Sequence, residues 1–118
     1  MSKELETKYK HLILTPENFD KIINSKKPVI VDFWASSCFS CRFMLPVFEK
    51  LANKYGEKMI FGRLNVLESV KNRDIAARYQ VFSIPSYVVF VKGKPVDRVT
   101  SSAREEDLEE LINKHVNA

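Results

Sequence analysis

Hydrophobic and polar positions along the chain predict strands that alternate with helices. Segment 28–35 is a continuous apolar run broken by a single acid, which is typical of a strand buried on both faces. Segments 11–14 and 58–66 are also expected to be strands. Segment 86–101 is expected to be a hairpin that turns near 92–95, and Pro95 suits an edge strand because it has no N–H to donate.

Helical spacing of apolar residues predicts four helices: one at 15–25, one that begins at or just after the cysteines and ends at 55, one at 68–80 and one at 102–116. Thr15 is expected to cap the first helix, with Pro16 at its first position. Pro46 lies inside the second helix and is expected to kink it. Ser102 and Glu105 have the spacing of a capping box at the start of the last helix.

Strand–helix alternation followed by a hairpin and a final helix is typical of an α/β fold. The early strands are expected to be parallel and the hairpin to add antiparallel strands, which gives a central mixed sheet of four or five strands with helices on both faces. The chain has 118 residues, enough to bury about two-thirds of its unfolded surface, and shows no linker or repeat. We therefore expect a single domain over 1–118, with 1–9 as a flexible N-terminal extension.

Composition excludes several classes of function. The 19 Lys and Arg residues exceed the 15 Asp and Glu residues by only four, and they are scattered along the chain. A nucleic-acid surface would need a basic stripe with interleaved aromatics, so no nucleic-acid partner is expected. The charged opening "MSKELETKYK" has no apolar core of a secretory signal, and no stretch is apolar enough to span a membrane. We expect a cytoplasmic protein with no membrane partner.

The only two cysteines, Cys38 and Cys41, lie three positions apart where the buried strand gives way to a helix. Backbone N–H groups and the helix dipole at a helix N-terminus favour a thiolate there, so the pKa of Cys38 is expected to be lowered. A bridge across so short a loop would stabilise the fold little and should open readily. This favours a redox pair over a structural staple.

Other interpretations of the cysteine pair stay open at this point. A structural zinc site needs four ligands, and the only histidines, His11 and His115, lie near opposite ends of the chain, so no metal site is expected. A metal or iron–sulfur cluster shared across a dimer, or two incidental core cysteines, are the remaining alternatives.

Asp32 lies in the buried strand, and strand alternation places it on the same face as Ile30 and Trp34. Burial would raise its pKa, and a buried acid behind a dithiol could exchange protons with it. The alternative is a structural aspartate that is either exposed at a sheet edge or hydrogen-bonded. For Pro85, the sequence alone favours a trans peptide bond.

Several motifs together resemble the thioredoxin family from Leu14 to Lys114. The stretches that carry the resemblance are "LTPENFDKII", "PVIVDFWASSCFSC", "LPVFEKLANKY", "RLNV", "IAARYQVFSIPSYVVF" and "KGKPV". The resemblance implies a thioredoxin fold and dithiol–disulfide exchange, in which Cys38 attacks a substrate disulfide and Cys41 resolves the mixed disulfide. It also implies that Asp32 assists proton transfer at Cys41 and that Pro85 follows a cis peptide bond.

The same resemblance implies which residues contact a substrate. Ile84 matches the residue whose backbone pairs with bound substrate, and Trp34 matches the aromatic side chain beside the site. Phe39 is expected to present an apolar contact next to the nucleophile, or else to pack on a neighbouring loop. Ser101 stands in the loop before the last helix where the family has glycine.

Departures from the family pattern concern substrate range and redox poise. Thioredoxins proper carry W-C-G-P-C, whereas this chain has Ser37 before the first cysteine and "FS" between the two. The hypothesis is that loss of the proline makes the disulfide a stronger oxidant. Ser40 or Ser37 could donate a hydrogen bond to the Cys38 thiolate. Arg63 replaces the usual lysine near Asp32, and Ser86 replaces the usual threonine after the proline.

The expected function is reduction of protein disulfides by a monomer that binds no cofactor. Its reversible Cys38–Cys41 disulfide would be reduced by an external reductase, such as a thioredoxin reductase or its equivalent. The alternatives are a disulfide oxidase or isomerase of the same fold, or a non-catalytic binding module that uses the groove at Pro85.

Overall fold

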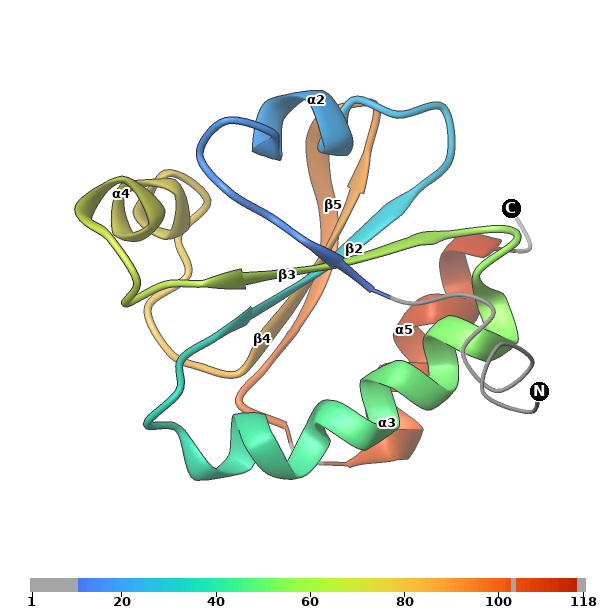
Figure 1. Ribbon diagram of the computed structural model, residues 1–118. Coiled ribbons are helices and arrows are strands. Elements are labelled where there is room, and N and C mark those ends of the chain that lie inside the picture. Colours follow the sequence, from blue (N-terminus) through green and yellow to red (C-terminus); the bar gives the residue numbers. More distant parts are fainter. Residues whose placement is uncertain (1–10, 103, 117–118) are drawn as a thin grey trace, which may run out of the picture.

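The computed structural model describes residues 11–102 and 104–116, so the expected extension at 1–9 lies outside the described residues. Strands and helices alternate until a hairpin precedes the last helix (Figure 1). The elements are β1 (Leu12–Ile13), α2 (Phe19–Ile23), β2 (Val29–Trp34), α3 (Phe39–Tyr55), β3 (Ile60–Asn65), α4 (Val70–Arg78), β4 (Ser86–Val91), β5 (Lys94–Thr100) and α5 (Glu105–Val116).

The strands form one five-stranded mixed sheet in the order β1-β3-β2-β4-β5. Strands β1, β3 and β2 run parallel, and β4 and β5 are antiparallel to their neighbours. The predicted α/β class and mixed sheet are confirmed. β2 is the central strand, which explains why its sequence is almost wholly apolar.

Helices cover both faces of this sheet, with α2 and α4 on one face and α3 and α5 on the other (Figure 1). Because side chains alternate along each strand, β2 contributes to two cores. Val31 and Phe33 pack toward α2 and α4, whereas Ile30 packs toward α3 and α5. The cysteine pair lies where β2 ends and α3 begins.

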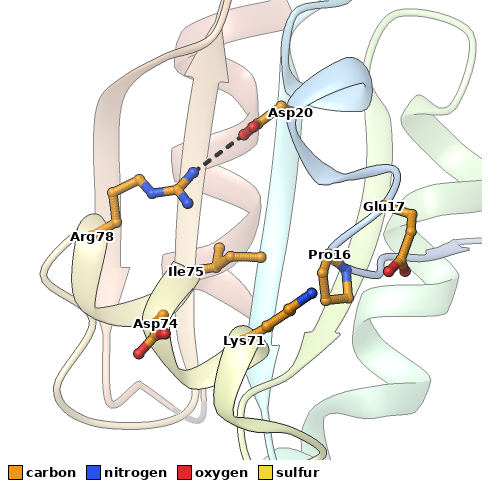
Figure 2. Close-up of a pocket in the computed structure, with 7 residues that line it drawn as sticks. All are labelled: Pro16, Glu17, Asp20, Lys71, Asp74, Ile75 and Arg78. Atoms are coloured by element: carbon orange, nitrogen blue, oxygen red, sulfur yellow. Dashed lines mark hydrogen bonds and ion pairs between the residues drawn. The ribbon is translucent and has the colours of Figure 1, made fainter.

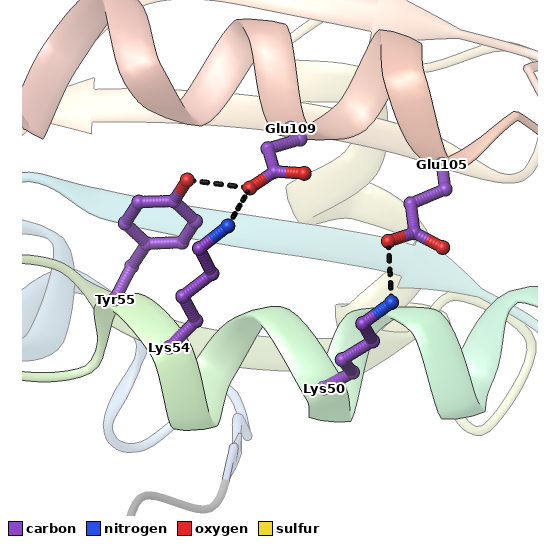
Figure 3. Close-up of polar contacts among 5 residues, drawn as sticks. All are labelled: Lys50, Lys54, Tyr55, Glu105 and Glu109. Carbon is purple, nitrogen blue, oxygen red and sulfur yellow. Dashed lines mark hydrogen bonds and ion pairs between the residues drawn. The ribbon is translucent and has the colours of Figure 1, made fainter.

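A polar clamp of five residues fixes α3 against α5 (Figure 3). Lys50 Nζ donates to Glu105 at 2.8 Å, and Glu109 accepts from Lys54 Nζ at 2.6 Å and from the Tyr55 hydroxyl at 2.5 Å. The Lys54 hydrogen bond, followed by that from Tyr55, lowers the pKa of Glu109. The clamp links the C-terminal half of α3 to α5 on the same face of the sheet.

Two predicted helix starts are wrong in detail. Thr15 does not cap α2, because the backbone first makes a turn in which Thr15 and Asn18 exchange side-chain hydrogen bonds, and the helix begins only at Phe19. The capping box at Ser102 does not form with Glu105. Ser102 Oγ accepts from the backbone N–H of Arg104 and donates to Asp107 instead.

The predicted hairpin is confirmed, with a two-residue turn at Lys92 and Gly93. Both residues have positive φ, 52° and 84°, which is the pattern of the turn type that matches strand twist. Pro95 lies in β5 at the edge of the sheet, as expected. Among the described residues, no helix has the length and apolar character needed to cross a membrane.

Candidate active site

Cys38 is the N-cap residue of α3. It has extended backbone geometry, with φ −89° and ψ 112°, and its Sγ accepts a hydrogen bond from the backbone N–H of Cys41 at 3.2 Å. This is the cap position where a helix offers unpaired N–H groups to a negative charge. The Cys38 side chain is part-buried, whereas Cys41, one turn later, is buried. The less buried of the two cysteines is therefore also the one whose sulfur the helix end can stabilise as an anion.

Cys38 and Cys41 are joined in a disulfide, with their Cα atoms 5.3 Å apart. Their separation of three residues therefore permits bonding without any rearrangement of the helix. Ser40 Oγ lies 3.6 Å from Cys38 Sγ, so of the two serines that the sequence offered as partners, it is Ser40 that reaches the sulfur. No group of three or more His, Cys, Asp or Glu side chains suited to a metal ion occurs within the described part of the chain.

Asp32 is buried, as predicted, and forms an ion pair with another buried side chain. Arg63 Nε donates to Asp32 Oδ2 at 2.9 Å, and both side chains are almost completely enclosed. Burial raises the pKa of Asp32 from its usual 3.8 to about 6, although the charge and the hydrogen bond of Arg63 both lower it. The cost of desolvating the carboxylate therefore outweighs the attraction of the permanent cation.

Arg63 also connects this carboxylate to the aromatic side chain expected beside the site. Its guanidinium carbon lies 4.0 Å from the centroid of the Trp34 ring, which is the geometry of a cation–π contact. Trp34 is half-buried at the end of β2. Asp32, Arg63 and Trp34 thus form one continuous group beneath the cysteine loop.

The peptide bond between Ile84 and Pro85 is cis, which agrees with the family resemblance and not with the sequence alone. Pro85 comes directly before β4, whose first residue, Ser86, lies opposite Phe33 of β2. Because β2 and β4 are antiparallel, this end of β4 meets the end of β2 that leads to the cysteines. The loop that ends at Pro85 (the proline loop) and the loop that holds Cys38 (the cysteine loop) therefore lie at the same end of β2 and β4.

Ser101 completes the proline loop. Its backbone N–H donates to Pro85 O at 2.8 Å, and its hydroxyl donates to Ser83 Oγ at 3.0 Å. Ser101 has a φ of 60°, the left-handed region in which glycine is the least strained residue. This explains the glycine of the family at this position, and the Ser83 bond offsets part of the strain here.

Two apolar side chains near the proline loop were not singled out by the sequence analysis. Phe82 is 80% exposed and Leu67 is 54% exposed, and together with Ile84 they line an open pocket of about 280 Å³. Arg73 lies at the same pocket. The signal in the sequence was an aromatic residue just before "SIP", outside any strand or helix period. Phe39, at 77% exposure, is exposed rather than packed on a loop.

A second pocket, of about 270 Å³, lies between α2 and α4 and is polar (Figure 2). It is lined by three acids and two bases, and Asp20 pairs with Arg78 at 3.3 Å. None of the residues predicted for the active site contributes to it. An exposed ion pair of this kind contributes little to stability.

Comparisons with known proteins agree with this geometry. The family model described as Thioredoxin matches residues 10–114. A thioredoxin of Staphylococcus haemolyticus is 41% identical over 103 residues, which is 87% of this chain and 95% of that protein. A thioredoxin of Alicyclobacillus acidocaldarius is 38% identical over 98 residues, covering 83% and 90% of the two chains. The solved structure of Malassezia sympodialis thioredoxin superposes with a TM-score of 0.83 at 28% identity and covers 92% of each chain.

Proposed function

The chain belongs to the thioredoxin family and is a protein-disulfide oxidoreductase, and we propose that it reduces disulfide bonds in other proteins through Cys38 and Cys41. The observation that carries the proposal is the disulfide between a part-buried cysteine at the helix cap and a buried cysteine one turn later. One sulfur is placed to meet a substrate and the other to release it.

The reaction takes two exchange steps. In the reduced protein, the Cys38 thiolate attacks one sulfur of the substrate disulfide, and the other substrate sulfur leaves as a thiolate. Cys41 then loses its proton and attacks Cys38 Sγ, which breaks the mixed disulfide. The products are a dithiol substrate and the Cys38–Cys41 disulfide, so two electrons have moved from the protein to the substrate.

Asp32 is the proposed acceptor of the Cys41 proton. A carboxylate whose pKa is raised to about 6 is mostly ionised at neutral pH and is still basic enough to take up a proton during the exchange. Its burial also prevents direct exchange with bulk water. In the reverse direction the same group would return the proton to Cys41.

Substrate recognition is assigned to the surface around Cys38. The backbone of Ile84 next to Pro85 is proposed to pair with an extended substrate segment, as in strand addition. Trp34, Phe39 and Ser101 border the same surface. The open apolar pocket beside Ile84 would hold an apolar side chain of a protein substrate. A small-molecule disulfide has no such side chain to place there.

The protein is proposed to work as a cytoplasmic monomer with no bound cofactor. The only redox group needed for turnover is the Cys38–Cys41 pair itself. Electrons to regenerate the dithiol would come from a separate thioredoxin reductase or an equivalent enzyme. The formal net charge of +4 would favour acidic partners only weakly.

Reduction of insulin disulfides, with dithiothreitol as electron source, tests the proposal. We expect the wild-type protein to accelerate insulin reduction and Cys38→Ser to lose the activity, since the attacking sulfur is gone. Ser37→Ala serves as a control in the same loop and should remain active. A Cys38→Ser protein as active as the wild type would contradict the proposed roles.

A further inference from the structure

A row of three polar side chains crosses the sheet beneath α3. Arg63 of β3 lies opposite Asp32 of β2, and Asp32 in turn lies opposite Tyr87 of β4. Directly opposed residues on neighbouring strands point to the same face, with Cβ atoms about 5 Å apart. Tyr87 is therefore the neighbour of Asp32 on the side away from Arg63.

Each member of this row has one buried polar atom without a hydrogen-bond partner. The atoms are Asp32 Oδ1, Arg63 Nη2 and the Tyr87 hydroxyl oxygen. An unsatisfied buried polar group costs about 1–3 kcal/mol, so three such atoms in adjacent residues call for an explanation. The set contains a carboxylate oxygen that accepts and two groups that donate, which makes the three chemically complementary.

Tyr87 is held as a neutral donor. Its side chain is fully buried, and its ring stacks on Phe48 of α3 with centroids 6.0 Å apart. Burial, and after it the charge of Asp32, raise the pKa of Tyr87, whereas Arg63 lowers it. The hydroxyl thus keeps its proton over the whole physiological range.

We propose that Tyr87 is a positioning residue for the buried acid: its hydroxyl donates a hydrogen bond to one bridging water molecule, which in turn donates to Asp32 Oδ1 and so stabilises the ionised carboxylate. The proposal rests on the role of Asp32 under the proposed function. It adds a second donor that opposes the effect of burial, on the side of Asp32 that Arg63 does not reach.

The surroundings leave few other groups to set the charge of Asp32. The buried residues of α3 on this face are Cys41 followed by Met44, Phe48, Leu51 and Ala52, and those of α5 are Leu108, Leu111 and Ile112. Ile30 of the same strand, and Phe61 and Val89 of the neighbouring strands, belong to the same core. Among the described residues of this face, Arg63 and Tyr87 are the charged or titratable groups directly opposite Asp32, and Cys41 of α3 is buried on the same side of the sheet. Tyr55 packs at the margin of this core, and His11 lies against Phe48.

The Tyr87→Phe variant tests this inference because it removes only the hydroxyl. In the oxidised protein, the Asp32 carboxyl carbon is followed by NMR as the pH is varied. We expect the pKa of Asp32 to rise by about one unit, since a hydrogen bond to a charged group is worth about 1.5–3 kcal/mol and one pKa unit is about 1.4 kcal/mol. The acid limb of the pH profile for insulin reduction should move upward by the same amount.

Tyr55→Phe is the matched control. It also removes one tyrosine hydroxyl, but from the clamp between α3 and α5, and should leave the Asp32 titration unchanged. If Tyr87→Phe changes only the free energy of unfolding, with the pKa of Asp32 unchanged or lowered, the inference is overturned and Tyr87 is a packing residue.

The Asp32→Asn variant separates this inference from the proposed function. If its pH profile equals that of the wild type, Asp32 has no part in the exchange and that role fails. The NMR titration of Tyr87→Phe would still decide whether the hydroxyl acts on the carboxylate. A raised pKa without any change in the activity profile would therefore support the Tyr87 interaction and contradict the role of Asp32.

Discussion

Burial and charge act against each other on Asp32. The carboxylate is 1% exposed and pays a desolvation cost that Arg63, at 2.9 Å, only partly offsets. Such a group is destabilising in its ionised form, and proteins keep such groups mainly where their protons are used. The position of Asp32 in the central strand explains why the cost is large, because the side chains around it are buried as well.

The stability of the oxidised protein should therefore depend on pH in a predictable direction. The pKa of Asp32 is raised, from its usual 3.8 to about 6, so the folded state binds more protons than the unfolded state between these values. Through Asp32, stability is lost as the pH rises across this window. We expect Asp32→Asn to gain about 3 kcal/mol relative to the wild type between pH 4 and pH 7.

Denaturant unfolding at a series of pH values measures this difference. The charge of Arg63 loses its partner in Asp32→Asn, but that cost does not vary with pH, so the slope and not the offset is the quantity to compare. A difference in unfolding free energy that stays constant from pH 4 to pH 7 would show that Asp32 is not perturbed by burial.

The role of an individual residue could be predicted only where the sequence immediately around it indicates that role. The cysteines and Asp32 carry local signals in sequence, and the structure shows the predicted burial of Asp32. The cis peptide bond before Pro85 was expected only from the family resemblance, because the sequence alone favours trans. Tyr87 carried no local signal, because only the register of β2 against β4 shows that it faces the buried acid. Pairing across a sheet is a long-range property that a hydrophobic pattern does not encode.

Among the secondary elements, the order of strands and helices was predicted correctly, and the errors lie at helix ends. Helix α2 begins after the turn at Thr15, and Ser102 bonds to Arg104 and Asp107 instead of forming a box. Polar side chains at these ends have several partners within reach. Tertiary contacts, such as the pairing of Glu105 with Lys50, determine which of these hydrogen bonds forms.

The loops that precede α4 and β4 together form the proposed substrate pocket. The aromatic side chain that lines this pocket is that of Phe82, which is 80% exposed. We expect Phe82→Ala to lower kcat/KM for a protein disulfide roughly tenfold, because an apolar contact of that size is lost. Reduction of a small disulfide such as hydroxyethyl disulfide should be unaffected, since it does not reach the pocket.

Val96→Ala is the matched control for this prediction. Val96 is also a large exposed apolar residue, but it lies on β5 at the sheet edge and does not line the pocket. It should leave both activities unchanged. Equal losses toward protein and small disulfides in Phe82→Ala would indicate damage to the cysteine site and contradict a role in substrate binding.

At the scale of the whole molecule, the fold alone does not determine the reduction potential. We expect the short stretch of sequence around the two cysteines to determine it. The chain has the fold of a thioredoxin although it carries Phe39 and Ser40 between the cysteines, so the fold does not depend on a Gly-Pro pair at these two positions. Fold and reaction type could be predicted from the sequence for this reason. Substrate and reductase could not, because they depend on surfaces assembled from several loops.

Equilibration with glutathione of known ratio measures the reduction potential. We expect a value above the approximately −270 mV of thioredoxin, because Phe39 and Ser40 replace the usual Gly-Pro pair. The double variant with Phe39→Gly and Ser40→Pro should move toward that value. A wild-type potential at or below about −270 mV would refute the stronger-oxidant hypothesis.

Trapping the mixed disulfide tests most directly whether Cys38 is the attacking sulfur and Cys41 the resolving sulfur. Reduced Cys41→Ser protein is mixed with a disulfide-bonded substrate protein, and the product is analysed by mass spectrometry after digestion without reductant. We predict a stable mixed disulfide that joins the substrate to Cys38, because the resolving thiol is absent. Absence of any adduct on Cys38, or an equally stable adduct on Cys41 in the Cys38→Ser protein, would contradict the account.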